Sequence, residues 1–92
     1  MAFSKELVAG ILNAPPTQGS KLGRLALGLN FSVTRIAKLT GATRQTVYNW
    51  MWGGKVAPYY RTHVSDLIKI LRSAASSDGA WKEACQHFNY RN

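Results

Sequence analysis

Acidic residues are scarce in this chain. Only 4 of the 92 residues are Asp or Glu, against 12 Lys and Arg, so the formal net charge is +8. No acid occurs from Leu7 through Ser65. This excess of cations favours a polyanionic partner, although acidic membranes and acidic proteins also attract basic domains.

Cysteine and long apolar runs are scarce as well. Cys85 is the only cysteine, so no internal disulfide can form, and we expect Cys85 to be a buried apolar residue. No apolar stretch approaches the roughly 20 residues that span a membrane, and the amino end lacks the pattern of a secretory signal. These absences predict a cytoplasmic, nucleoid-associated protein with no membrane partner.

Residues arranged for catalysis or ligand binding are also missing from the sequence. The four acids are scattered, the two histidines are far apart, and there is no Gly-rich phosphate loop. Cys85 and His87 would point in different directions from one helix and have no further ligands beside them, which argues against a zinc site. We therefore expect a binding module rather than an enzyme, with no cofactor, metal or small-molecule ligand.

The apolar residues recur at helical spacing, and no segment alternates as a strand would. This predicts an all-α, compact single domain over residues 1–92, a bundle of about five to six short helices. Residues 14–19 are expected to form a linker. The expected helices cover residues 4–13, 22–30, 33–40, 43–52, 58–71 and 79–88.

Residues 32–52 have the pattern of a helix-turn-helix. The first helix of this motif would turn Ile36, Ala37 and Thr40 inward and end at Gly41, which tolerates a left-handed conformation. Thr43 is a suitable N-cap for the second helix. Along that helix, the inward positions are Val47, Trp50 and Met51.

The opposite side of this second helix, residues 43–52, carries polar and aromatic side chains. Arg pairs well with guanine, and Gln and Asn pair with adenine, in the major groove of DNA. A solvated polar helix face is the alternative explanation, but this face follows a complete helix-turn-helix pattern in a cationic chain. The residues on this side are Arg44, Gln45, Thr46, Tyr48, Asn49 and Trp52.

The segment Gly41-Ala42-Thr43-Arg44-Gln45-Thr46-Val47-Tyr48-Asn49-Trp50 resembles the lambda-repressor-like helix-turn-helix family, of the Cro and xenobiotic-response-element type. The resemblance extends over about residues 22–71. A single small domain without a ligand-sensing part also looks like the compact regulators of phages and mobile elements. It implies base contacts from Thr43, Arg44, Gln45, Thr46, Tyr48 and Asn49.

The sequence departs from the family pattern in two places. Val33 occupies the position where the family often has a phosphate-binding Gln, so Ser32, Thr34 or backbone amides would have to make that contact. After Trp50 the loop is about one residue longer than usual and lacks an acid. The full set of expected phosphate contacts is Ser32, Thr34, Arg35, Lys38, Lys55, Tyr59 and Arg61.

The leading hypothesis is a sequence-specific transcriptional regulator that binds double-stranded DNA with residues 43–52 in the major groove. The resemblance also suggests a homodimer, with the first or last helix at the interface, unless both helices only complete the core. Two other classes remain open. One is a protein-interaction module of the same shape, for example an inhibitor of a host factor, which an exposed Trp52 would favour; the other is a nonspecific nucleoid-type DNA binder.

Overall fold

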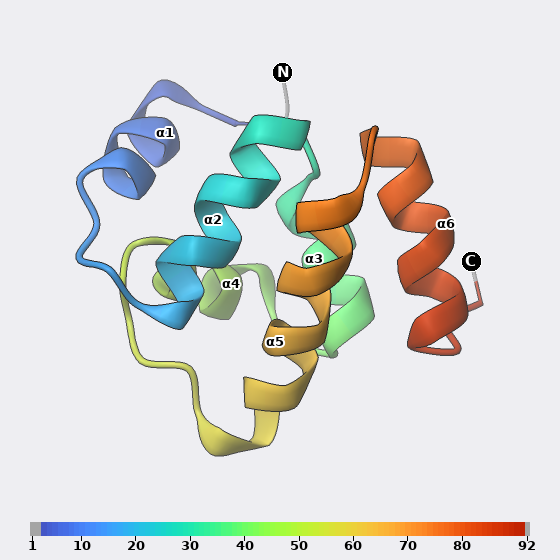
Figure 1. Cartoon of the computed structure of the whole chain (residues 1–92). Coiled ribbons are helices and arrows are strands. Elements are labelled where there is room, and N and C mark those ends of the chain that lie inside the picture. Colours follow the sequence, from blue (N-terminus) through green and yellow to red (C-terminus); the bar gives the residue numbers. More distant parts are fainter. Residues whose placement is uncertain (1–2, 92) are drawn as a thin grey trace.

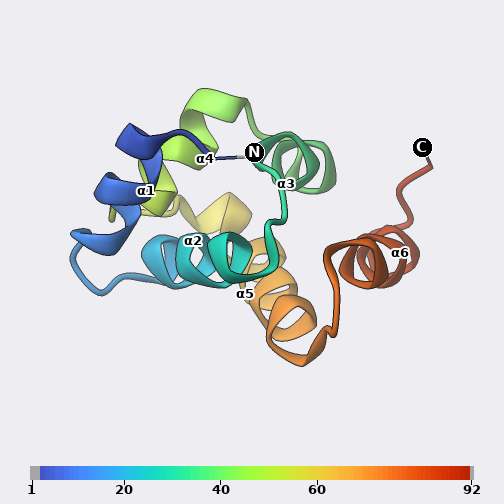
Figure 2. The same cartoon turned by 90° about the horizontal axis from the view of Figure 1, so that it is seen from above.

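The computed structural model describes residues 3–91, and all regular elements in this range are α-helices. The six helices pack into a single small all-α domain (Figures 1 and 2). This confirms the expected fold class. In chain order the helices are α1 (Lys5–Leu12), α2 (Gln18–Leu29), α3 (Val33–Thr40), α4 (Arg44–Met51), α5 (Pro58–Ser73) and α6 (Ser77–His87).

Polar side chains fix the start of five of the helices. Each of these residues adopts an extended backbone and accepts a hydrogen bond from an amide in the first helical turn, which satisfies a donor that the helix leaves unpaired. Helix α5 has no side-chain cap and begins instead at Pro58, which suits the first turn of a helix. The five caps are Ser4, Thr17, Ser32, Thr43 and Ser76.

Two helix starts differ from the expectation by two residues or more, and α5 continues to Ser73, two residues beyond the expected end. Helix α2 begins at Gln18, because Thr17 and Ser20 form a reciprocal capping box, so the expected linker 14–19 is shorter. Helix α6 begins at Ser77 rather than at Gly79, because Ser76 caps it through the Gly79 amide. In both places a serine or threonine hydroxyl starts the helix earlier than the apolar pattern indicates.

All six helices contribute to the core, which contains the expected inward residues of α4, Val47, Trp50 and Met51. Ile36 and Thr40 of α3 are buried as expected. Ala37 packs against the core as expected but is half-buried, and Cys85 is half-buried instead of fully buried. The largest fully buried side chains are Trp50, Phe31, Ile11, Leu22, Ile36, Met51 and Leu67.

Glycines on α2 let α4 approach closely. A Cβ on Gly19 would lie 2.8 Å from the carbonyl carbon of Trp50, and a Cβ on Gly23 would lie 3.0 Å from the Cβ of Met51. Both glycines are buried, so any larger side chain would have to push α4 away. The position of α4 therefore depends on the small residues of α2.

Candidate nucleic-acid interface

A three-residue turn joins α3 to α4. Gly41 ends α3 in the left-handed region with φ of 78°, and its amide donates to the Ala37 carbonyl oxygen at 2.9 Å. The buried Thr40 hydroxyl donates to the Ile36 carbonyl at 2.8 Å and accepts from the Ala42 amide at 3.3 Å. These bonds fix the direction in which the chain enters α4.

The first turn of α4 is organised by two threonines. The Thr46 amide donates to the Thr43 hydroxyl oxygen at 3.1 Å, as expected for an N-cap, and the two hydroxyl oxygens are 2.9 Å apart in a second hydrogen bond. The amides of the first turn carry the positive end of the helix dipole. Thr43 is exposed and Thr46 is half-buried. Because of the bond between them, both hydroxyls already have a hydrogen-bond partner at the start of the helix.

Three of the expected base-contacting residues lie on α4 and are exposed to solvent. Arg44, Gln45 and Asn49 are all exposed, and the Gln45 side-chain amide donates to the Asn49 Oδ1 at 3.3 Å. Because these two residues are four apart, their side chains lie one above the other on the same side of the helix. We call Arg44, Gln45 and Asn49 the outer face of α4.

Tyr48 lies differently from the expectation that it points outward with this set. Its ring is half-buried and stacks on Trp52, with ring centroids 6.1 Å apart and an interplanar angle of 21°. The Trp52 ring in turn lies against α1, since a Cβ on Gly10 would come within 2.5 Å of its Cδ1. Tyr48 and Trp52 thus form the edge of the α4 surface that lies next to α1.

A small cavity opens at this edge, between α1 and the end of α4. It has a volume of about 380 Å³, and its lining includes Tyr48, Trp52 and the exposed Glu6. Glu6 was not expected near α4. Nothing in the local sequence brings them together, because the contact depends on how α1 folds back along the bundle.

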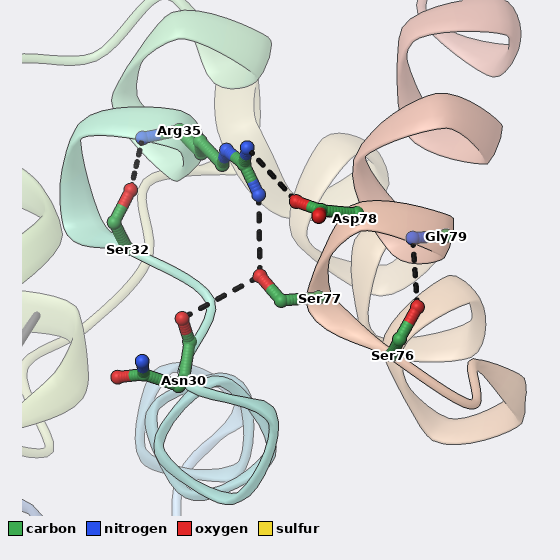
Figure 3. Close-up of polar contacts among 7 residues, drawn as sticks. All are labelled: Asn30, Ser32, Arg35, Ser76, Ser77, Asp78 and Gly79. Atoms are coloured by element: carbon green, nitrogen blue, oxygen red, sulfur yellow. Dashed lines mark hydrogen bonds and ion pairs between the residues drawn. The ribbon is translucent and has the colours of Figure 1, made fainter.

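Arg35 is the clearest difference among the expected phosphate contacts. Its guanidinium donates to the Ser77 hydroxyl at 3.2 Å and forms an ion pair with Asp78 at 3.3 Å, both on α6 (Figure 3). It also lies over the rings of Phe31 and Trp81, 5.9 and 5.1 Å from their centroids. Arg35 therefore joins α3 to α6 instead of presenting a free charge.

The remaining expected phosphate contacts divide into capping and exposed residues. Ser32 accepts a hydrogen bond from the Arg35 amide at 3.2 Å as the N-cap of α3 (Figure 3). Arg61 donates from its Nε to the Val56 carbonyl at 3.3 Å, in the loop before α5. The expected contacts that are exposed are Thr34, Lys38, Lys55, Tyr59 and Arg61.

The loop after α4 folds back on the helix end. The Gly54 amide donates to the Asn49 carbonyl at 2.8 Å, and Gly53 takes a positive φ of 96° against Pro15. Lys55 lies in this loop, and Tyr59 lies in the first turn of α5. The side chain of Tyr59 is 76% exposed and is the most exposed large ring of the described chain.

The His, Cys, Asp and Glu residues are the side chains that could bind a metal ion. Within residues 3–91 no three of them gather as metal ligands would. His87 and Asp66 lie 3.0 Å apart across α5 and α6, but they have no third partner of this kind in that range.

None of the helices in the described range is both long and apolar enough to cross a membrane.

Comparisons of the chain with protein-family models, with curated proteins and with solved structures gave no match.

Proposed function

We propose that this protein is a sequence-specific double-stranded DNA-binding regulator of transcription that inserts α4 into the major groove. The observation that carries the proposal is the outer face of α4, where Arg44, Gln45 and Asn49 are exposed together on a helix held by a short turn. An α-helix fits the width of the major groove, and these three residue types are those that pair bidentately with base edges.

The chemistry of the outer face suggests a division of work. Arg44 can donate two hydrogen bonds to the O6 and N7 of guanine, while Gln45 or Asn49 can pair with the N6 and N7 of adenine. The bond between the Gln45 and Asn49 amides leaves each with free donors and acceptors, since each amide has more than one of them. The pair would thus meet the bases in a prearranged position.

Charge supports a DNA partner. The net charge is +8, and the cations Lys38 and Lys55 are exposed on α3 and in the loop that follows α4. Binding to phosphates releases counterions, so the affinity should fall with salt at a log-log slope of about −0.9 for each phosphate contact on duplex DNA.

A protein-interaction module is the second candidate, and one observation favours it. Trp52 is 43% exposed beside Tyr48 and α1, where its ring could contact a partner protein. In that case α1 and α4 would dock on another protein, and the outer face would not contact DNA.

A salt titration with matched variants tests the proposal. The affinity for a fluorescent duplex of random sequence is measured by anisotropy for the wild type, for Lys38→Ala, which removes an exposed cation expected at a phosphate, and for Lys82→Ala, which removes an exposed cation of α6 instead. We expect Lys38→Ala to weaken binding and to reduce the salt slope by about 1, while Lys82→Ala changes little. Equal losses in both variants would indicate only bulk attraction, and no binding at low salt would favour the protein-interaction module.

A further inference from the structure

A second cationic surface lies away from α4, in a groove between α2 and α5. Figures 1 and 2 show these two helices side by side, and in Figure 2 α4 lies on one side of α2 and the C-terminal half of α5 on the other. The groove has a volume of about 670 Å³, the size of a typical ligand pocket.

The groove and α4 lie against opposite sides of α2. The buried Gly23 contacts Met51 of α4, whereas Lys21 and Leu25, two positions before and after it, lie in the groove. A helix turns about 100° per residue, so positions two apart point to opposite sides. One helix therefore supports α4 with one side and the groove with the other.

Four cations surround the groove. Lys21 and Arg24 are one turn apart on α2, and Lys69 and Arg72 are one turn apart on α5. All four are exposed. The guanidinium of Arg24 donates to the Ala14 carbonyl at 3.1 Å, but this acceptor is neutral, so the positive charge remains uncompensated.

Two apolar side chains, which we call the apolar floor, lie in the groove beside polar residues that include the buried Ser20 and the half-buried Ser65. Ile68 is buried with 7% exposure, and the half-buried Leu25 lies opposite on α2. None of the described residues that line the groove is acidic or aromatic. Single-stranded nucleic acid usually stacks on aromatic rings, and duplex phosphates need cations but no apolar floor.

We propose that this groove binds an acidic, amphipathic peptide segment of another protein. Carboxylates of the segment would pair with the lysines and arginines on both helices, and apolar side chains at helical spacing would contact Leu25 and Ile68. The domain would then have two separate surfaces, so a bound peptide would leave the outer face of α4 free. The proposal does not depend on whether α4 binds DNA.

A peptide titration tests this site. The probe is a short fluorescein-labelled peptide, rich in Glu and Asp, with leucines at positions i, i+3 and i+7, and its anisotropy is followed against the full-length protein. The groove variant is Lys69→Glu/Arg72→Glu. The matched control is Lys5→Glu/Lys82→Glu, which has the same net charge but changes exposed cations of α1 and α6.

We expect the groove variant to lose affinity by roughly tenfold or more and the control by less than about threefold. A peptide with the same acids but with Ser in place of the leucines should bind distinctly more weakly than the probe. Circular dichroism of both variants verifies that they remain folded, and Lys69→Ala/Arg72→Ala replaces the groove variant if charge reversal unfolds it.

Three results would overturn the proposal. Equal losses in both variants would show general attraction between opposite charges. Equal binding of the two peptides would show an anion site in which the apolar floor has no part. A groove variant that keeps peptide affinity but loses affinity for duplex DNA would assign the groove to a second stretch of nucleic acid.

Discussion

The close approach of α2 to α4 makes a sharp prediction for two glycines of the same helix. Gly19→Ala would place a methyl group 2.8 Å from the carbonyl carbon of Trp50, and still closer to its oxygen. These are backbone atoms, so no side-chain rotation can relieve the contact and α4 itself must move. Gly28→Ala, at the other end of α2, would meet nothing within 4 Å.

The two substitutions should change stability in opposite directions. Overpacking costs about 1–3 kcal/mol, and replacing Gly by Ala within a helix returns up to about 1 kcal/mol, so Gly19→Ala should lower the free energy of unfolding by about 1–2 kcal/mol. For a domain of this size the Tm should fall by roughly 5–15 °C. Gly28→Ala has only the favourable contribution and should raise the Tm by roughly 2–8 °C.

Thermal unfolding followed by circular dichroism compares the two variants with the wild type. The substitutions are chemically identical and lie in one helix, so differences in composition cancel. A Tm of Gly19→Ala equal to or above that of the wild type would refute the close crossing of α2 and α4. A destabilised Gly28→Ala would refute the open space at that position.

The remaining predictions concern the N-cap of α4, the contact of Arg35 with α6, and Glu6 beside α4. Thr43→Ala removes the N-cap of α4 and should lower stability by about 1 kcal/mol in urea unfolding, whereas an unchanged midpoint would contradict the cap. Arg35→Ala removes packing on two rings and should lower the free energy of unfolding by about 1–2 kcal/mol. Asp78→Ala should lower it by less than about 1 kcal/mol, because the Asp78 carboxylate is exposed. Equal losses of stability in the two variants would contradict this order. Glu6→Gln should tighten duplex binding at low salt and lose this effect at high salt, while Glu83→Gln on α6 should not, and equal effects would contradict a DNA surface beside α1.

Local patterns in the sequence were sufficient for most of the helical structure. The cap Thr43 and the break at Gly41 lie where the expectation put them, because a cap or a turn depends on neighbours within a few residues. The start of α2 was placed too late, because the apolar pattern begins at Leu22 while the capping box begins the helix earlier.

The tertiary surroundings of the candidate site could not be predicted from such patterns. Helical spacing indicated that Tyr48 lies off the core side of α4, but not that α1 and Trp52 would partly cover it. Arg35 seemed a free cation beside the motif, and its partner Asp78 is 43 positions away in the sequence. A charge count cannot show which cations already have partners.

The cationic groove illustrates the same limit. Lys21 and Lys69 lie far apart in the sequence, and each resembles an ordinary solvated lysine of an amphipathic helix. Only the packing of α2 beside α5 brings them to one groove. The outer face of α4, in contrast, comes from one continuous segment, so the sequence was enough to group Arg44, Gln45 and Asn49.

The most direct test of the central claim, that the outer face of α4 recognises base sequence, is selection of bound duplexes from a randomised DNA pool at about physiological salt. Wild type is compared with Gln45→Ala and with Gln86→Ala, a matched change at an exposed position of α6. The account predicts one enriched motif for wild type and Gln86→Ala, relaxed at a single base for Gln45→Ala by about 1–3 kcal/mol of discrimination. No enriched motif, or the same motif for all three proteins, would contradict base recognition by this face.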